Sequence, residues 1–174
     1  TPAYNAEKTI EKCLDSLLNQ TLKEIEIIVI NDCSKDNTLK ILKKYKNKIK
    51  LIDNKENLGP AGSRNKGLDV AQGKYIGFVD ADDWIAPNMY ELMSSKMTDE
   101  VDLVACSRIN VTKSGEKSII NKNKDTDAKA FTKTSNYNCD KLFKREIINS
   151  AASPSSLSVL KSRGVILSTG TELK

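Results

Sequence analysis

The stretch IEIIVINDCSKDNT, residues 25–38, joins a nearly continuous run of β-branched apolar residues to a polar segment. Such a run is typical of a strand that is buried on both faces, as in a sheet covered by helices. Apolar residues at helical spacing precede it at 6–20, where Asn5 is the expected N-cap, and follow it up to Lys48. The stretch therefore predicts a strand between two helices, with polar side chains where the strand ends.

The same alternation continues along the chain. Apolar runs at 49–52, 75–79 and 102–106 predict strands, and the segments 61–72 and 88–97 predict helices. Strands that alternate with helices favour an α/β fold with a mixed, mostly parallel sheet and helices on both faces. A chain of 174 residues has room for one such domain with a hydrophobic core.

Beyond residue 110 the pattern weakens, and we divide the chain accordingly. Residues 1–110 form the predicted α/β part, and residues 111–149 begin a second part with an apolar cluster around Phe143. Residues 150–174 are a tail rich in serine and small residues, with no clear amphipathic period. We expect no packed structure for this tail.

Charge and composition exclude several classes of protein. The net charge is +5, from 28 basic and 23 acidic residues, and residues 101–174 hold 13 basic residues against 7 acidic ones. This excess fits an anionic partner such as a phosphorylated lipid or a membrane surface, or else a solvated lysine-rich surface. Aromatic residues make up 5% of the chain and are not interleaved with basic ones, which argues against nucleic acid as a partner.

The cysteines are scattered: Cys13, Cys33, Cys106 and Cys139 form no Cys-x-x-Cys pair, and the chain contains no histidine. This pattern argues against a zinc site and favours reduced thiols in a cytoplasmic protein. No apolar run approaches the roughly 18 residues of a membrane span, and no signal-like leader is visible, so we expect a soluble chain.

Polar segments follow three of the predicted strands, at 31–36, 57–65 and 80–83. In open parallel sheets, ligands bind outside the carboxyl ends of the strands. Since these ends meet at one edge, we expect the three segments to share a rim.

Three carboxylates occur within four residues, in Asp80-Ala81-Asp82-Asp83. They repel one another unless a cation or extensive hydrogen bonding compensates the charge. With oxygen ligands and no histidine, Mg²⁺ or Mn²⁺ is the natural cation. The alternative is a solvated acidic turn that caps the following helix.

Asp32 and Arg64 are the other candidate site residues. Asp32, at the end of a buried strand, could accept hydrogen bonds from a base imide or a ribose hydroxyl, or it could cap the next helix. Arg64 lies early in a predicted helix beside small residues, so a guanidinium and a helix N-terminus could face a nucleotide together. An ion pair between Arg64 and one of the aspartates across the rim is the alternative.

Five segments in order resemble motifs of the family 2 glycosyltransferases, which have the GT-A fold. TPAYN at 1–5 is similar to the P-x-Y-N end of that family's first strand, and 28–38 to its V-D-D-x-S-x-D-x-T element. NLGPAGSRNKG at 57–67 resembles N-x-G-x-x-x-A-R-N-x-G, FVDADDW at 78–84 resembles F-L-D-x-D-D, and DKLFKR at 140–145 resembles N-K-L-F-K-R. The resemblance covers about residues 1–149.

The resemblance implies transfer of a sugar, with inversion, from a nucleoside diphosphate, expected to be UDP, to a glycan or lipid-linked acceptor. Residues 1–110 would bind the nucleotide sugar and 111–149 would begin the acceptor side, with peripheral contact at the inner face of the membrane. The implied metal is Mn²⁺ or Mg²⁺. The implied substrate-binding residues are Pro2, Tyr4, Asp32, Asn57, Arg64 and Asp82, and the implied metal ligands are Asp83 and Asp82.

Several features depart from the family pattern. Asn31 replaces the first aspartate of the usual pair, Ser63 replaces the alanine before Arg64, and the tail does not resemble the family's continuation. After Arg145 the only acids are Glu146 and Glu172, neither in a motif suited to the general base, so the base is not identified. One alternative is a module that binds nucleotide sugar without transferring it. Another is a sugar-phosphate nucleotidyltransferase, whose Gly-rich phosphate loop is not visible.

Overall fold

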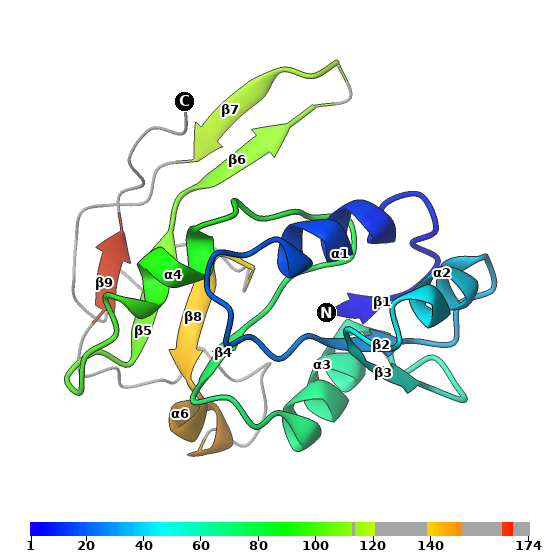
Figure 1. The fold of residues 1–174 in the computed structure, drawn as a ribbon, viewed down its shortest axis with the longest axis horizontal. Helices are drawn as coiled ribbons and strands as arrows, with labels where there is room; N and C mark the ends of the chain where they lie inside the picture. The colour runs from blue at the N-terminus through cyan, green and yellow to red at the C-terminus, as the bar shows by residue number, and fades with distance from the viewer. Residues whose placement is uncertain (113, 121–138, 151–164, 169–174) are drawn as a thin grey trace.

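A computed structural model describes residues 1–112, 114–120, 139–150 and 165–168 (Figure 1). The elements in chain order are β1 (Pro2–Ala3), α1 (Ile10–Leu18), β2 (Ile28–Asn31), α2 (Thr38–Lys44), β3 (Lys50–Asp53), α3 (Gly59–Val70), β4 (Tyr75–Gly77), α4 (Met89–Ser94), β5 (Leu103–Cys106), β6 (Arg108–Val111), β7 (Lys117–Ile120), β8 (Lys141–Lys144), α6 (Arg145–Ser150) and β9 (Val165–Ser168). The predicted alternation of strands and helices is confirmed through α4.

The first sheet is parallel and has the order β1-β2-β3. Alternate residues of β2 point to opposite faces, so Val29 and Ile30 are both buried but meet different helices. Val29 packs in one cluster with residues of α1 and α2. On the other face α3 lies so close that a Cβ on Gly67 would stand 3.1 Å from the Ile30 Cδ1. Helices therefore cover both faces, as predicted.

The second sheet has the order β4-β8-β5-β9 and mixes strand directions. Strand β8 runs antiparallel to both β4 and β5, while β9 is parallel to β5. All four residues of β8 are buried, including two lysines. Lys141 pairs with Asp140 at 3.0 Å and Lys144 with Asp102 at 3.5 Å, so neither charge is buried without a partner.

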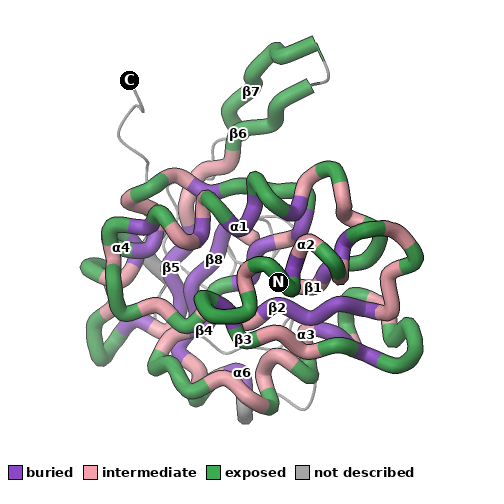
Figure 2. The backbone as a smooth tube through the Cα atoms, turned by 45° about the vertical axis from the view of Figure 1, so that its right-hand side comes forward, coloured by how far each residue is buried: buried purple, intermediate pink, exposed green. Residues whose placement is uncertain are grey.

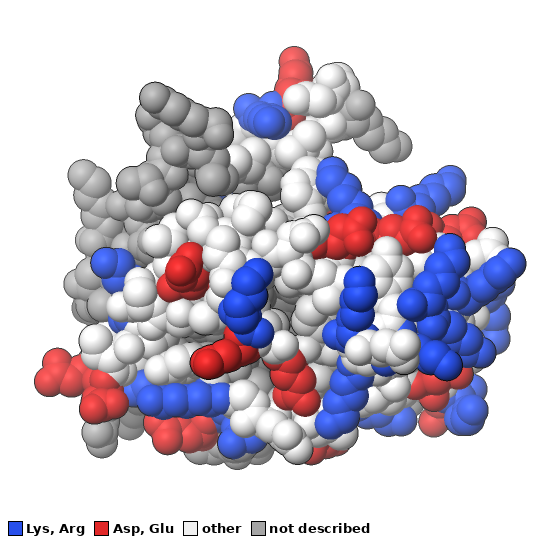
Figure 3. Space-filling view, in the orientation of Figure 1, with Lys and Arg blue, Asp and Glu red and all other residues white. Residues whose placement is uncertain are grey.

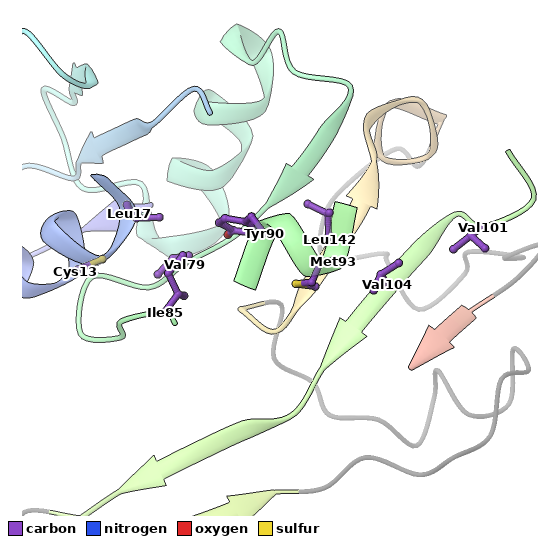
Figure 4. Close-up of a cluster of buried hydrophobic side chains, with 9 residues drawn as sticks. All are labelled: Cys13, Leu17, Val79, Ile85, Tyr90, Met93, Val101, Val104 and Leu142. Atoms are coloured by element: carbon purple, nitrogen blue, oxygen red, sulfur yellow. The ribbon is translucent and has the colours of Figure 1, made fainter. Parts of the chain in front are cut away.

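Strand β8 completes the core between the sheets. Phe143 is fully buried and meets Phe78 edge to face at 6.2 Å between ring centroids. A second cluster joins α1 to α4 and β5 through Cys13, Leu17, Tyr90, Met93 and Val104, as Figure 4 shows. In Figure 2 the buried backbone runs along β2, β5 and β8 through the middle of the molecule.

The first helix differs from the prediction at its start. It begins at Ile10 with Thr9 as N-cap, whereas the sequence predicted a start near residue 6 with Asn5 as N-cap. Asn5 has a positive φ of 49°, whereas an N-cap residue usually has a β-region backbone. Residues 6–9 form a turn ahead of α1, in which the Ala6 carbonyl accepts from the N–H groups of Thr9 and Ile10.

The region after residue 107 contains a two-stranded hairpin, β6 with β7, that projects from the body of the molecule (Figures 1 and 2). The polar composition there predicted no strands, because the hairpin has no buried face to impose an alternating pattern. In the tail, the described residues are those of β9, paired with β5. The rest of the 150–174 segment apart from Ser150 lies outside the described residues.

Candidate functional site

Asp32 directly follows β2 at the carboxyl end of the first sheet and is 2% exposed. Its Oδ1 accepts hydrogen bonds from Asn54 Nδ2 at 2.8 Å and from the Leu58 backbone N–H at 2.9 Å. Burial raises the pKa of this carboxyl, but hydrogen bonds from Leu58, Asn54, Ser63 and Gly59 together hold its pKa below the ordinary value. A rigid, charged acceptor therefore stands at the end of β2.

Helix α2 does not use this carboxylate as its cap. The helix begins at Thr38, after Asn37 as N-cap, and Asp36 instead accepts a hydrogen bond from the Thr38 N–H at 2.9 Å. The alternative in which Asp32 caps the next helix is therefore wrong.

The polar residues between β2 and α2 also bind the loop that follows β1. Ser34 Oγ accepts from the Asn5 N–H at 3.1 Å, and Thr38 Oγ1 accepts from the Ala6 N–H at 2.8 Å. Asp36 Oδ2 accepts from the Glu7 N–H at 3.0 Å. These side chains hold the loop that carries Tyr4, whose own side chain is half exposed.

Burial raises the pKa of the Asp36 carboxyl, but its hydrogen bonds from Thr38 and Glu7 outweigh that effect and leave the pKa below the ordinary value. In the same loop between β2 and α2, Cys33 has a positive φ of 60°. A non-glycine residue in this region is strained, and such strain gathers at binding sites.

Asn57 fixes the start of α3. Its Oδ1 accepts from the Gly59 N–H at 3.0 Å, and Gly59 has a φ of +71°, where glycine is favoured. The helix begins at Gly59, two residues before the predicted start, with Pro60 at its first turn. A Cβ on Gly62 would lie 2.7 Å from the Leu58 Cβ, so only glycine lets the turn close here.

Consecutive residues of α3 contact the carboxylate that follows β2 and one carboxylate of the acidic segment that follows β4. Ser63 is fully buried and hydrogen-bonds to Asp32, while Arg64 Nη2 donates to Asp80 Oδ1 at 2.6 Å. The expected alternative of an ion pair between Arg64 and an aspartate is thus present. Helix α3 brings the segment after β2 and the segment after β4 to one edge, as the sequence predicted.

Three polar atoms at this rim are buried without a hydrogen-bond partner in the structure. They are Asn31 Oδ1, Asn54 Oδ1 and Arg64 Nε. Asn31 Nδ2, by contrast, donates to Asp53 Oδ1 at 2.7 Å. Buried polar groups are normally paired, so each of these atoms has hydrogen-bonding capacity that the protein does not use.

The acidic segment after β4 forms a turn in which the Asp83 N–H donates to the Asp80 carbonyl at 3.0 Å. The next helix, α4, begins at Met89 with Asn88 as N-cap, so the acidic residues do not cap it. One ligand atom each of Asp80, Asp83 and Cys139 lie within 4.8 Å of one another. Asp82 is exposed and is not part of this group.

The group of Asp80, Asp83 and Cys139 carries excess negative charge. Burial, Asp82 and Asp80 raise the pKa of Asp83, against opposing effects of Arg108 and Cys139. The Cys139 Sγ donates to Asp80 Oδ2 at 3.0 Å, and burial together with Asp80 raises the pKa of this thiol. Arg64 pairs with Asp80 and compensates part of this charge, and the remaining convergent carboxylate oxygens fit a divalent cation.

Of the predicted site residues, Pro2 pairs in β1 with Ile30, and Tyr4, Asn57, Asp82 and Asp83 are exposed around the rim. Cys139 was not predicted. It precedes the DKLFKR segment by one residue, but only the antiparallel course of β8 between β4 and β5 carries it back to Asp80.

A cavity of about 540 Å³ lies beside the rim, between β2, α3 and β4. Apolar side chains of β2 and β4, such as Ile28, Ile30 and Ile76, line it, and Arg64 is the only predicted site residue on its wall. We place the polar site at the rim and not in this cavity, because its apolar walls offer few partners for phosphate or ribose.

Lys and Arg side chains gather over α2 and β3, on the right in Figure 3, with Asp and Glu among them. Lys44 pairs with Glu11 at 3.6 Å and Lys50 with Glu26 at 3.8 Å. Among the described residues, no helix combines the length and apolar character that crossing a bilayer requires.

The family described as Glycosyl transferase family 2 matches residues 1–151. Uncharacterized glycosyltransferase YibD of Escherichia coli (strain K12) is 43% identical over 110 residues, which cover 61% of this chain and 32% of YibD. UDP-Glc:alpha-D-GlcNAc-diphosphoundecaprenol beta-1,3-glucosyltransferase WfgD of Escherichia coli is 45% identical over 98 residues, 55% of this chain and 38% of WfgD. The chain thus spans well under half the length of either relative.

Among solved structures, S. aureus TarS 1-349 in complex with UDP-GlcNAc aligns with a TM-score of 0.76 at 23% sequence identity. The alignment covers 99% of this chain and 58% of the TarS chain. At this identity the likeness concerns the fold alone.

Proposed function

The chain belongs to glycosyl transferase family 2 and has a GT-A fold, and on that premise we propose that it is the donor-binding part of an inverting, metal-assisted glycosyltransferase. The donor is a nucleoside diphosphate sugar with UDP as the nucleotide. The acceptor is a glycan or a lipid-linked glycan. Residues 1–110 bind the donor, and residues 111–149 begin the acceptor side.

One observation carries the proposal: neighbouring residues of α3 reach both carboxylate groups. Ser63 contacts Asp32 after β2, and Arg64 contacts Asp80 in the acidic turn after β4. A nucleoside at Asp32 would therefore lie next to a diphosphate at the acidic turn. A nucleoside diphosphate, with a polar nucleoside at one end and a charged diphosphate at the other, matches these two parts of the rim.

The residues divide the donor between them. Pro2, Tyr4 and Asp32 bind the nucleoside, with Tyr4 free to stack because its side chain is exposed and Asp32 accepting hydrogen bonds. Arg64 lies beside the base and Asn57 shapes the loop next to it.

Asp82 and Asp83 would hold Mn²⁺ or Mg²⁺. An oxygen of Asp80 lies within 4.8 Å of one of Asp83, whereas Asp82 lies outside that group and would have to turn toward it. When bound, the cation stabilises the negative charge that develops on the departing diphosphate. Asp80 is held in place by Arg64, so the acidic turn keeps its shape before the donor binds.

The names of related proteins support the donor. WfgD, 45% identical in the matched region, is named for UDP-Glc and for a diphosphoundecaprenol acceptor, and TarS was crystallised with UDP-GlcNAc. A lipid-linked acceptor also fits peripheral contact with an anionic membrane surface at the cytoplasmic side. The basic excess of residues 101–174 supports that contact.

We assign neither acid that follows Arg145 as the general base for the acceptor hydroxyl. Glu172 lies outside the described residues, and Glu146 lies in α6, beside β8 and away from the acidic turn. A non-catalytic nucleotide-sugar-binding module remains the second candidate, since donor binding needs no base. A sugar-phosphate nucleotidyltransferase is less favoured, because the described residues around β1 form no Gly-rich phosphate loop.

Calorimetric titration of UDP with Mn²⁺, and again with chelator, tests the donor site. We expect binding that requires Mn²⁺ and that weakens about tenfold or more in Asp83→Asn, because a direct metal ligand is lost. Asp69→Asn is the matched control, since Asp69 is an exposed carboxylate on the far half of α3. Binding by a folded Asp83→Asn as tight as that of the control would refute the metal assignment, and no UDP binding by the folded chain would refute the donor.

Transfer is tested separately. Intact protein that contains this chain should release UDP from UDP-sugar when an acceptor is present. Tight UDP binding without turnover would favour the non-catalytic module.

A further inference from the structure

Helix α2, the turn after it and the start of β3 carry six exposed lysines that the donor site does not use. No acidic residue and no other basic residue occurs from 37 to 52, so this stretch has six positive charges and no negative one. It belongs to the part of the surface over which Lys and Arg side chains gather in Figure 3. We call these residues the lysine surface: Lys40, Lys43, Lys44, Lys46, Lys48 and Lys50.

Acidic side chains from other elements compensate only part of this charge. Lys44 pairs with Glu11 at 3.6 Å and Lys50 with Glu26 at 3.8 Å, and ion pairs as exposed as these contribute little. Within the described part of the chain, the remaining four lysines of the surface make no ion pair. They are Lys40, Lys43, Lys46 and Lys48.

The stability of α2 explains only two of the six lysines. Lys43 and Lys44 stand in the last turn, where a positive charge interacts favourably with the helix dipole. Lys40 lies three and four positions before them, so it faces like charges on one side of the helix, which destabilises a helix slightly. Lys46 and Lys48 follow the end of α2. The cluster as a whole therefore favours a partner that supplies negative charge.

The residue types favour a diffuse anionic surface over a ligand of defined shape. Arg, whose planar group binds phosphate through two parallel hydrogen bonds, is absent from 37–52. A single-stranded nucleic acid would need aromatic faces for base stacking, but Tyr45 is only partly exposed and donates to Asp15 at 3.3 Å. Point charges on flexible side chains instead suit the headgroups of anionic phospholipids, which clusters of about four to eight basic residues bind.

We propose that the lysine surface docks this protein on a bilayer that contains anionic phospholipid. The lysine surface is separate from the basic excess of residues 101–174. Helix α2 begins at Thr38, directly after the polar segment 31–36 of the rim, and its seven residues span about 10 Å. Docking through the lysine surface therefore holds the rim close to the membrane, where a lipid-linked acceptor is presented. This consequence rests on the proposed function, whereas the docking itself does not.

Sedimentation of the chain with lipid vesicles, in the absence of nucleotide, tests the proposal. We expect binding to vesicles of phosphatidylglycerol mixed with phosphatidylcholine and no measurable binding to phosphatidylcholine alone. The affinity should fall about tenfold or more when the salt rises from about 0.05 M to about 0.3 M, because salt screens exposed charges.

Two variants of equal net charge separate the lysine surface from the overall charge of the chain. The first replaces the four unpaired lysines: Lys40→Gln, Lys43→Gln, Lys46→Gln and Lys48→Gln. The control replaces four exposed lysines outside 37–52: Lys23→Gln, Lys66→Gln, Lys74→Gln and Lys96→Gln. We expect the first to bind anionic vesicles about a hundredfold more weakly than wild type, since each lysine near such a surface contributes about a fivefold factor. The control should stay within about threefold.

The outcomes are distinct. Equal losses in the two variants would show that net charge alone attracts the chain and would overturn the proposal. Equal binding to neutral vesicles, binding that salt does not weaken, or tighter binding to single-stranded DNA than to anionic vesicles would overturn it too. If the first variant does not fold, as circular dichroism would show, these wild-type measurements decide. Because UDP is absent, vesicle binding by a chain that binds no UDP supports the docking and refutes only the donor assignment.

Discussion

Replacing Asp32 with alanine should destabilise the fold as well as the nucleoside site. The substitution removes the acceptor that now stands 2.8 Å from Asn54 Nδ2 and 2.9 Å from the part-buried Leu58 N–H. An unsatisfied buried donor costs about 1–3 kcal/mol, so the two together cost at most about 6 kcal/mol. Because Asn54 Nδ2 keeps Ser63 Oγ at 3.3 Å and water can reach the Leu58 N–H, we expect a loss of about 3 kcal/mol in the free energy of unfolding.

Urea unfolding followed by circular dichroism measures this loss as a lower midpoint at unchanged slope. For a chain of this size the midpoint of thermal unfolding should fall by about 6–12 °C. Asp69→Ala, on the exposed side of α3, is the control and should stay within about 0.5 kcal/mol of wild type. A folded Asp32→Ala chain as stable as this control would show that the hydrogen bonds of Asp32 contribute nothing net, and the account of a rigid acceptor would fail.

Three further predictions follow from the site and its support. The pKa values of Asp32 and Asp36 lie below their ordinary value, so their contribution to stability is present above about pH 4 and is lost as the pH falls through the lowered values. Asp36→Asn should therefore make the free energy of unfolding depend less steeply on pH in this range. Urea titrations at several pH values measure this dependence, and a dependence equal to that of wild type would contradict the prediction. Gly77→Ala should cost about 1–3 kcal/mol, because its Cβ would lie 2.5 Å from the buried Tyr90 Oη, and a thermal midpoint equal to wild type would refute this contact. Arg64→Met should weaken UDP binding by about tenfold in calorimetry through the loss of hydrogen bonds from a charged group; an unchanged dissociation constant would remove Arg64 from the donor site.

Much of the N-terminal fold could be predicted because its signals are local. The run at 25–30 is apolar because both faces of β2 are covered, and that requirement appears in consecutive residues. The strand is nevertheless paired only from Ile28 to Asn31. Ile25 and Ile27 pack against the core clusters, and the Ile27 carbonyl also accepts from the Lys50 N–H at 2.8 Å.

Local pattern located the helix but not its first residue. Ala6 and Glu7 donate their N–H groups to Thr38 and Asp36, about thirty positions later. The start of a helix leaves such N–H groups without an intrahelical partner, so these side chains cap the turn at 6–9 in which the Ala6 carbonyl accepts from the Ile10 N–H at 2.9 Å. The residues Ser34, Asp36 and Thr38 therefore build the rim, while Asp32 alone of that motif presents its carboxylate at the end of β2.

The sequence by itself determined the family, the alternation of strands with helices and the rim at which Asp32, Arg64 and the acidic turn meet, because strand ends can be located from local composition. Only the tertiary structure decided that Arg64 pairs with Asp80 and that Cys139 joins Asp80 and Asp83. The contact of Cys139 depends on β8 lying antiparallel between β4 and β5. The position of β8 depends on how it buries Phe143 and its two paired lysines against other elements. A strand of four buried residues has no periodic pattern from which its neighbours could be predicted.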